Sequence, residues 1–383
     1  MTSWLSLAAI AILSISIGGY APRPDNVSPG DIRLSGENRE GPPHLVFACD
    51  GSTSELETLF SQPDVIPALK ALNAGIALAL PDLSPDRARI VRQLNSAGIP
   101  VTAWLALPAE QGYYLNASNS QEAATRFADF RTWTRNYDLR WAGVGLDIEP
   151  NIQEFATLRS SKWRLARTLI KRYFDIDRVR RAREAYASLI HEIQAHGYPV
   201  ETYQFPFIVD ARRVHSTLLE RLAGIVDVRG DREVLMIYTS FNKRLDSALI
   251  WVYGPDAQAI AVGVTSGSNA SPRFAPLNWE EFSRDLIVAN HFSHVVGVYN
   301  LAGCVHQGFL PRLRTMNWDQ PVEIPAESIR KATQLRARIQ RAIWLVAHLP
   351  YLATAILIAI IWLLVWRRRR RFQRSLRTQQ NPG

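Results

Sequence analysis

Two carboxylates, Asp147 and Glu149, end an apolar segment of this 383-residue chain directly before Pro150. In an extended strand alternate side chains share a face, so both acids point the same way. An acid that caps a following helix is the simpler alternative, but two acids directed into a protein interior are costly unless they have a role. Paired carboxylates supply general acid–base chemistry, and the cleavage of glycosidic bonds is one reaction that uses them.

The acids stand at the end of a segment that has the pattern of a barrel strand. Gly143 and Gly145 share their face, while the residues between them are aliphatic. A strand that buries aliphatic side chains on one side and presents glycines and acids on the other is typical of a (β/α) barrel. In that fold the carboxyl ends of the strands carry the chemistry.

Eight apolar, strand-like runs alternate with helical stretches along the chain. Near-continuous apolar strands alternating with helices indicate a parallel sheet, and eight such units predict a closed (β/α)8 TIM barrel over residues 44–325. The apolar fraction of 47% is ample for its core. The predicted strands are residues 44–50, 75–82, 99–108, 142–150, 198–207, 233–241, 259–267 and 294–303.

The chain also contains a candidate membrane span. Residues 349–366 are eighteen residues without a charge, and from residue 343 the apolar segment reaches 24 residues, enough to cross a bilayer. We predict a juxtamembrane helix at 326–342, a transmembrane helix at 343–366 and a basic cytoplasmic tail at 367–383. The tail has seven arginines, which by the positive-inside rule places the barrel outside the cytoplasm. Five basic residues flank the other end: Arg330, Lys331, Arg336, Arg338 and Arg341.

The amino terminus indicates export. Residues 1–21 contain an apolar stretch followed by small residues, which is typical of a signal peptide. No basic residue precedes the stretch, and Pro22 would follow the cleavage point, so an uncleaved N-terminal anchor is the alternative. Residues 22–43 are rich in Pro, Gly and charge and predict a linker.

The formal net charge of +9 does not indicate nucleic-acid binding. Seven of the charges lie in the tail, which leaves +2 for the rest of the chain, and no basic stripe is interleaved with aromatic residues. A basic run from residue 159 to 183 has ten Lys or Arg against two Asp. It is either a solvated helix face or a contact surface for anionic wall polymer or lipid head groups.

The chain has two cysteines, Cys49 and Cys304, which the barrel places at the ends of its first and eighth strands. These strands are neighbours in a closed barrel, and an exported domain permits a disulfide, so the pair is a candidate to staple the closure. Two buried free thiols are the alternative. No His and Cys cluster has metal-ligand spacing and no Gly-rich phosphate loop occurs, so no metal or organic cofactor is expected.

At the acids the sequence resembles a known family. Residues 142–149 are similar to the D-G-x-D-x-D-x-E signature on strand four of family-18 glycoside hydrolases, the chitinase-like barrels, with matches at Gly143, Asp147 and Glu149. The resemblance implies that Glu149 protonates the glycosidic oxygen. It also implies that Asp147 orients the 2-acetamido group of the sugar, whose carbonyl oxygen attacks the anomeric carbon.

A second match lies in the sixth predicted strand. Met236 and Tyr238 look like the M-x-Y-D of the same family, which implies that Tyr238 donates a hydrogen bond to the acetamido oxygen. Three acids of the family pattern are absent, because Ala142, Gly145 and Thr239 stand in their places. Further candidates for a substrate-binding groove, besides Met236, are Asp50, Trp104, Tyr203, Gln204 and Asn300.

The sequence therefore predicts a membrane-anchored, extracytoplasmic glycosidase that acts on a polysaccharide containing N-acetylhexosamine, like chitin or peptidoglycan, by a substrate-assisted retaining mechanism. One alternative is a catalytically degenerate barrel that binds glycan or organises the cell envelope. A second is a retaining glycosidase with two glutamates and Glu149 as acid/base, although the seventh predicted strand has no acid to act as nucleophile.

Overall fold

A computed structural model of the chain describes residues 32–34, 41–151, 161–266 and 275–379. The predicted signal peptide or N-terminal anchor, residues 1–21, and most of the predicted linker, residues 22–43, lie outside the described residues. Within the linker range, β1 (Ile32–Leu34) is instead a strand and pairs antiparallel with β10 (Val322–Ile324). This small sheet joins the segment before the barrel to the segment after it.

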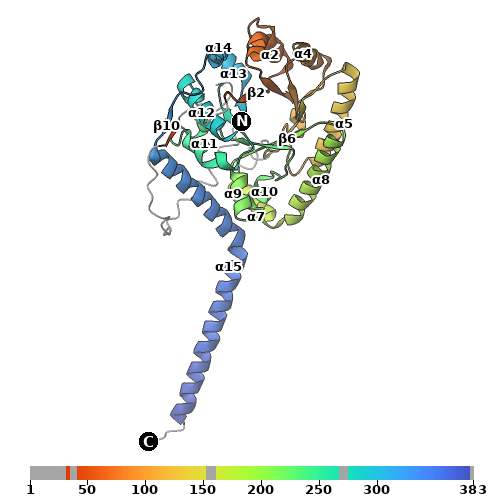
Figure 1. The fold of residues 1–383 in the computed structure, drawn as a ribbon. Coiled ribbons are helices and arrows are strands. Elements are labelled where there is room, and N and C mark those ends of the chain that lie inside the picture. The colour runs from red at the N-terminus through yellow and green to blue at the C-terminus, as the bar shows by residue number, and fades with distance from the viewer. Residues whose placement is uncertain (1–31, 35–40, 152–160, 267–274, 380–383) are drawn as a thin grey trace.

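Eight parallel strands form a closed barrel in which the first strand, β2, pairs with the last, β9 (Figure 1). All eight predicted strands are confirmed, and each is shorter than the apolar run that predicted it because the last residues of the run belong to the following loop or helix. The barrel strands are β2 (His44–Cys49), β3 (Gly75–Leu80), β4 (Val101–Leu105), β5 (Gly143–Asp147), β6 (Val200–Gln204), β7 (Arg232–Met236), β8 (Ala259–Gly263) and β9 (Val295–Tyr299).

Helices surround the barrel on the outside (Figure 1). Their starts follow local capping chemistry: Ser52 and Asn278 each form a reciprocal capping box with a glutamate three residues on, which satisfies two backbone N–H groups. The helices are α2 (Thr53–Ser61), α3 (Val65–Ala71), α4 (Pro85–Ser96), α5 (Ser120–Tyr137), α7 (Lys162–Phe174), α8 (Ile176–Ala195), α9 (Phe207–Arg213), α10 (Leu218–Ala223), α11 (Ala248–Tyr253), α12 (Trp279–Phe292), α13 (Leu301–His306), α14 (Phe309–Arg314) and α15 (Ala326–Gln379), with 3₁₀ turns η3 (Ala109–Gln111), η4 (Thr239–Phe241) and η5 (Gly254–Asp256).

The main core lies between the outer face of the barrel and these helices. Val144, Leu146 and Ile148 of the acid-bearing segment are fully buried in it, as the alternation of strand β5 predicts. The other face of the same strand points into the barrel. The two faces of this short segment therefore differ: aliphatic side chains pack on the outer face, and two carboxyl groups lie on the inner face.

One continuous helix, α15, covers the ranges predicted as juxtamembrane helix and membrane span. Its first part packs against α9 and α11 and its remainder projects away from the barrel (Figure 1). Among the described residues it is the one helix long and apolar enough to cross a membrane. The packed part ends near Ile343, which is 5% exposed, and two residues later Leu345 is 50% exposed.

A buried ion-pair cluster holds α15 to the barrel. The guanidinium of Arg336 lies 2.9 Å from Asp210 of α9 and 2.7 Å from Asp256 of η5, and it stacks over the ring of Tyr253. Gln340, one turn further on, donates to the same Asp210 carboxylate at 2.8 Å. Arg336 was counted above among the basic residues that flank the span, and this interpretation is corrected: it is an interior residue of the barrel–helix contact.

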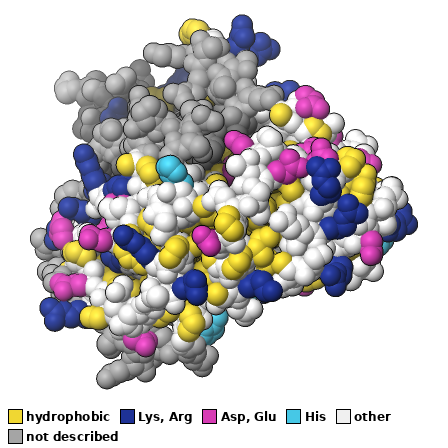
Figure 2. Space-filling view, turned by 90° about the horizontal axis from the view of Figure 1, so that it is seen from above, with side chains coloured by type: hydrophobic (Ala, Val, Ile, Leu, Met, Phe, Trp, Pro, Cys, Tyr) yellow, Lys and Arg dark blue, Asp and Glu magenta, His cyan; other side chains and the backbone are white. Residues whose placement is uncertain are grey.

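The face of the barrel turned away from the projecting part of α15 carries basic, acidic and hydrophobic side chains side by side (Figure 2). On α4, for example, Arg89 pairs with Asp86 at 2.6 Å and with Glu57 of α2 at 2.9 Å. Pairs exposed to this degree contribute little to stability. They do balance the charge of the surface.

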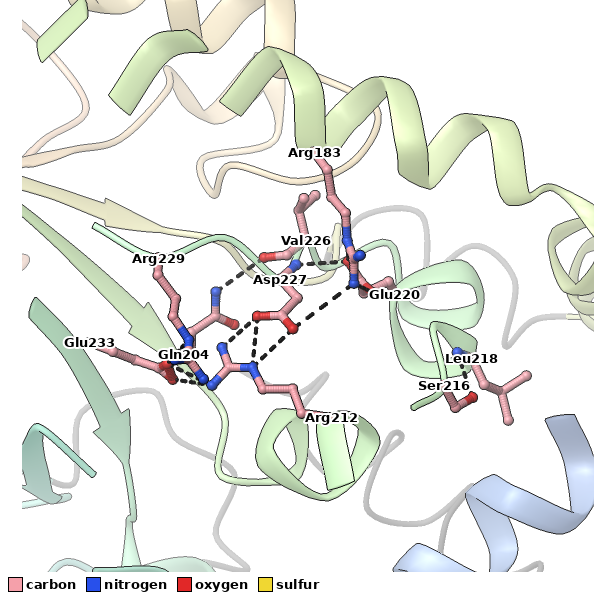
Figure 3. A network of polar contacts seen from close by, with 10 residues as sticks. All are labelled: Arg183, Gln204, Arg212, Ser216, Leu218, Glu220, Val226, Asp227, Arg229 and Glu233. Carbon is pink, nitrogen blue, oxygen red and sulfur yellow. Dashed lines mark hydrogen bonds and ion pairs between the residues drawn. The ribbon is translucent and has the colours of Figure 1, made fainter. Parts of the chain in front are cut away.

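The connection from β6 to β7 departs from the simple repeat. Two short helices, α9 and α10, are followed by an extended segment that returns along the outside of β6, and a network of arginines and acids fixes it (Figure 3). Arg212 contacts both Asp227 and Glu233, the latter at 2.7 Å. Arg183 of α8 reaches Glu220 of α10. Every acid of this network has an arginine partner.

Candidate functional site

The backbone beyond β5 carries the acid pair past the end of the regular strand. Leu115, from the loop after β4, bridges to Ile148: its N–H donates to the carbonyl of Asp147 at 3.2 Å, and its carbonyl accepts from the N–H of Glu149 at 2.8 Å. These two bonds keep the chain extended through Glu149. Asp147 and Glu149 therefore stay on the same, inward face, as the alternation predicts.

Both acids are buried, and neither forms an ion pair with a Lys, Arg or His of the described residues. Each is 3% exposed, and Oδ1 of Asp147 and Oε2 of Glu149 accept no hydrogen bond from the described residues. Burial raises the pKa of Asp147 well above its usual value. Burial, and then the neighbouring charge of Asp147, raise the pKa of Glu149 well above its usual value too. Burial therefore favours the protonated form of both carboxyl groups.

The acids look into a cavity of about 60 Å³ inside the barrel. Aromatic and aliphatic side chains line it, and among the described lining residues there is no Lys, Arg or His. Trp104 and Tyr203 form one wall, with ring centres 6.2 Å apart, and the indole N–H of Trp104 has no acceptor among the described residues. Over the same part of the chain no group of three or more His, Cys, Asp or Glu could hold a metal ion.

Tyr238 lies just past β7 and lines the same cavity. Its hydroxyl is close enough to the pair that, after burial, the charges of Asp147 and Glu149 are the largest causes that raise its pKa well above the usual value. Its ring packs 5.6 Å from that of Tyr299, which is on the last strand. The two acids and this tyrosine, predicted from separate motifs, are thus brought together.

Thr239, which stands where the family has an acid, points elsewhere. It is 1% exposed, and its hydroxyl donates to the carboxylate of Asp285 on α12. Burial is the main cause that raises the pKa of Asp285 to about 7. The residue after Tyr238 therefore has no carboxylate of its own but contacts the carboxylate of Asp285 on α12. The side chain of Asp285 does not line the cavity.

Asp50 and Asn300 form a small polar cluster at the ends of β2 and β9, beside the cavity. Asp50 accepts hydrogen bonds from the hydroxyl of Tyr299 and, at 3.1 Å, from the side-chain amide of Asn300. Asn300 also caps α13, because its amide oxygen accepts from the N–H of Gly303 at 3.0 Å. Neither Asp50 nor Asn300 lines the cavity, whereas Tyr299 does.

Tyr203 explains the glycine at the middle of the acid-bearing strand. A Cβ atom built on Gly145 would lie 2.7 Å from Cε2 of the Tyr203 ring, so a side chain cannot be added unless the ring moves. The hydroxyl of Tyr203 donates to Glu201 at 3.0 Å, and Glu201 pairs with Arg232 at 2.9 Å. The tyrosine thus occupies the space that the second acid of the family-18 pattern would take at residue 145, and its hydrogen bond to Glu201 holds it in place.

Of the predicted groove residues, Trp104, Tyr203 and Met236 line the cavity and Gln204 does not. Gln204 is fully buried on the outer face of β6, where its amide donates to the carbonyl of Val226 at 3.1 Å (Figure 3). The physical reason is the alternation of the strand. Because Tyr203 faces inward, its neighbour Gln204 must face outward.

Tyr114 lines the cavity and is not among the predicted site residues. Tyr114, in the loop after β4, is 8% exposed, and after burial the charge of Glu149 is the largest cause that raises its pKa. Glu201 lines the cavity as well, although its position near the start of its strand predicts the end of the barrel opposite to the acids. In the sequence, Tyr114 is one of two adjacent tyrosines after a predicted strand, which is only a weak signal for a site residue. The bridge between Leu115 and Ile148 is what brings Tyr114 to the acids.

The predicted disulfide is not formed, because Cys49 and Cys304 are both buried free thiols. Cys304 does not end a strand as expected. Strand β9 stops at Tyr299, and Cys304 lies within α13, where its thiol is 3.7 Å from the hydroxyl of Thr265. Burial raises the pKa of both thiols, that of Cys304 to about 12, which keeps them protonated.

The arrangement brings together two carboxyl groups with raised pKa values and a phenol in an enclosed, apolar space. A carboxylic acid held neutral at neutral pH is a proton donor, and the same group is a base once it has lost the proton. The site is therefore equipped for general acid–base chemistry.

Comparison with known proteins yields solved structures at the level of distant likeness. The glycoside hydrolase domain of PgaB from Bordetella bronchiseptica is 11% identical, covers 72% of this chain and 98% of its own, and has a TM-score of 0.44. The C-terminal domain of a putative chitinase from Desulfitobacterium hafniense DCB-2 is 10% identical, with a TM-score of 0.43 over 79% of this chain and 100% of its own. The GH18 chitinase ChiB from Flavobacterium johnsoniae is 11% identical, with a TM-score of 0.38 over 76% of this chain and 94% of its own.

The chain matches no protein-family model, and its sequence matches no curated protein. The structural likenesses lie below the level at which function is transferred. The (β/α)8 assignment therefore rests on the strand order, and the function is argued from the site.

Proposed function

We propose that this protein is a membrane-anchored glycoside hydrolase that cleaves a polysaccharide containing N-acetylhexosamine by substrate-assisted retention. The observation that carries the proposal is a pair of buried carboxyl groups, Asp147 and Glu149, that lie beside Tyr238 in an aromatic-lined cavity. No Lys, Arg or His lines this cavity among the described residues. Outside a catalytic role, such a pair only destabilises the barrel.

In the first step Glu149 acts as general acid. Its raised pKa keeps the proton that it transfers to the glycosidic oxygen as the bond to the anomeric carbon breaks. The acetamido carbonyl oxygen of the same sugar forms the new bond to that carbon, so the sugar supplies its own nucleophile. Glu149, now ionised, then removes a proton from the water that opens the cyclic intermediate, and the configuration is retained.

Asp147 and Tyr238 are assigned to the acetamido group. Asp147 accepts its N–H and stabilises the positive charge that develops during attack, and the phenol of Tyr238 donates to its carbonyl oxygen. Both side chains are close to Glu149 and in the same cavity, as these roles require. Trp104 and Tyr203 offer aromatic faces on which a sugar ring can stack.

The proposed location is the outer face of a membrane. The apolar part of α15 would cross the bilayer and its seven arginines would stay in the cytoplasm, so that the barrel faces the cell envelope. Removing Arg336 from the cations that flank the span makes the charge asymmetry across the span larger. The predicted signal peptide or second anchor at residues 1–21 acts in the same direction.

A second candidate function, a catalytically silent barrel that recognises glycan, is favoured by the size of the cavity. Its volume of about 60 Å³ holds a few waters, whereas ligand pockets generally have roughly 300 Å³ or more. The first candidate therefore requires side chains at the mouth of the cavity to move when a sugar enters. The second does not require a sugar to reach the acids.

One assay separates the two candidates. The full-length protein in detergent micelles is incubated with chitin oligosaccharides and peptidoglycan fragments, and the products are analysed by mass spectrometry beside a Glu149→Gln variant. The full chain is used because α15 neutralises the buried Asp210 of the barrel through Arg336. New reducing ends that are lost in the variant support the hydrolase. Binding of the glycan by both proteins, with cleavage by neither, supports the silent barrel.

A further inference from the structure

Helix α7 has an exposed apolar strip that nothing in the described structure covers. Trp163 is 87% exposed, Ile170 63% and Phe174 66%. At 100° per residue these three side chains lie within a sector of about 40° on one side of the helix. Ile176, at the start of α8, extends the strip and is 59% exposed. Four large apolar side chains with this exposure between residues 163 and 176 are unusual for a surface that faces only water.

A basic strip runs beside the apolar one. Arg164, Arg167 and Lys171 are exposed and lie within about 60° of arc next to the apolar strip. None of the three forms an ion pair with another described residue, whereas Arg172 on the inner side of the same helix donates to the carbonyl of Leu222 at 3.2 Å. These three residues are the central part of the basic run in the sequence.

The inner side of α7 fixes the helix with its apolar strip outward. Helix α7 packs against α10, and the ring of Tyr173 joins the apolar cluster that includes Ile339 and Ile343 of α15. The hydroxyl of Tyr173 donates to the carbonyl oxygens of Val346 at 2.7 Å and of Ala347 at 3.1 Å. These bonds lie where α15 leaves the barrel, directly before its exposed apolar part.

The two apolar surfaces are therefore continuous. Helix α7 lies with α9 and α10 on the side of the barrel from which α15 projects, whereas the opposite face carries mixed charges (Figures 1 and 2). A bilayer crossed by α15 would begin near Leu349, which is 54% exposed and only two residues beyond the second carbonyl that Tyr173 contacts. At 1.5 Å per residue this is about 3 Å along the axis.

We infer that α7 is a membrane-interface helix that seats the barrel on the lipid surface next to α15. Trp163, Ile170 and Phe174 enter the boundary between head groups and acyl chains, and the basic strip binds anionic head groups. A helix with one apolar strip rich in large side chains and an adjacent basic strip has the composition of interfacial helices. The inference rests on the membrane anchor of the proposed function and is independent of the glycosidase chemistry.

The experiment measures the depth of α7 in a bilayer that holds the full-length protein. An Ile170→Cys variant is labelled with a nitroxide and reconstituted into vesicles of phosphatidylcholine with phosphatidylglycerol. A Thr58→Cys variant, labelled on the exposed face of α2 far from α15, is the matched control. Wild-type protein is the labelling blank, because Cys49 and Cys304 are buried. Spin relaxation by oxygen, which enriches in lipid, is compared with relaxation by a water-soluble nickel chelate.

The expected result is a several-fold higher ratio of oxygen to nickel accessibility at residue 170 than at residue 58. Equal ratios at the two positions would overturn the inference and would favour a protein or wall polymer as the occupant of the strip. The anionic contact is tested by adding Arg167→Glu and Lys171→Glu. A lower ratio at residue 170 in the charge-reversed protein supports that contact, and an unchanged ratio removes the basic strip from the inference.

Failure of the anchor is recognised separately. Carbonate extraction of the same vesicles leaves a protein with a spanning helix in the membrane fraction and releases one without it. A protein that stays in the membrane but has a water-exposed residue 170 contradicts only the seating of α7. The glycan assay in detergent micelles does not depend on either result.

Discussion

Buried acids occur in two regions of this molecule and are treated in opposite ways. Outside the barrel, Glu220 and Glu233 are 1% and 4% exposed, and each has an arginine partner on a neighbouring element (Figure 3). Inside the barrel, Asp147 and Glu149 are equally buried, and no cation lines their cavity among the described residues. The residue types and the burial are the same, so the partner is the difference.

The outer network has a structural purpose. Its arginines connect α8, α9, the returning segment and β7, and breaking such a pair leaves a charge buried without compensation. The inner pair connects nothing and raises the cost of folding. The comparison indicates that removing a carboxyl group should affect stability outside the barrel and turnover inside it.

The largest expected effect is on turnover. We expect Asp147→Asn to lower kcat by about 10²- to 10⁴-fold, because the amide cannot stabilise the positive charge that develops on the acetamido group. The free energy of unfolding at neutral pH should not fall, because a buried carboxyl group, whose charged form burial disfavours, is replaced by a neutral group of the same shape. Steady-state kinetics and urea denaturation check the two halves. Normal kcat in this variant and in Glu149→Gln would remove the acids from the site.

The reverse pattern is expected from the outer network. Arg212→Ala should lower the free energy of unfolding by about 3 kcal/mol, while the kcat of the folded protein is retained. The substitution removes the nearest cation of Asp227 and Glu233, which keep only longer contacts, to Arg183 at 3.9 Å and to Arg229 at 3.6 Å. The neighbouring Arg213→Ala is the control, because its pair with Asp256 is half exposed and should contribute no more than about 1 kcal/mol. Equal losses of stability in both variants would contradict the comparison.

Asp285 is buried like the other acids, but its carboxyl group accepts a hydrogen bond from a neutral hydroxyl, that of Thr239. We expect it to make the stability of the protein depend on pH. Its pKa is about 7 in the folded protein and about 3.9 in the unfolded chain, so between these values the unfolded state loses the proton and the folded state keeps it. The contribution of Asp285 to stability is therefore complete below pH 4 and falls as pH rises towards 7, by about 2–4 kcal/mol. Asp285→Asn should remove this fall. Parallel stability curves for wild type and variant over pH 4–8 would exclude it.

The smallest effect is expected at Gly145. A methyl group there would meet the Tyr203 ring, so Gly145→Ala should lower the free energy of unfolding by about 1–3 kcal/mol. Adding Tyr203→Ala should recover part of this loss, because the ring that causes the contact is gone. Thermal denaturation of the two single variants and the double variant measures the coupling. Additive losses would show that the methyl group and the ring do not compete for space.

The sequence predicts the barrel well because each of its eight strands is a near-continuous run of apolar residues. This pattern is local and repeats eight times along the chain. The acid pair was found for the same reason: alternation alone puts Asp147 and Glu149 on one face. The same rule, applied to Tyr203 and Gln204, would have shown that adjacent residues cannot both face a groove. That error was avoidable.

Other features depend on contacts between distant parts of the chain. The burial of Arg336 depends on Asp210, which lies 126 residues earlier in the sequence. Strand β1, which precedes the barrel in the sequence, forms only because it pairs with β10, which follows the barrel. Tyr114 reaches the acids only because Leu115 bridges to the end of β5. Cys304 was misplaced because an apolar run does not reveal where a strand gives way to a helix.

The ion-pair cluster at Arg336 has a mechanical consequence. Ion pairs fix the first part of α15 to the barrel, and the same helix continues outward without a break. The barrel is therefore attached to a rigid helical stalk and not to a flexible linker. From Arg336 to Leu349 the stalk measures about 20 Å along the helix axis. A protein held in this way does not sweep through a volume around its anchor. With α15 across a membrane, as proposed, the barrel would stay at one height and in one orientation, and only polymer chains that pass close to the membrane would come within its reach.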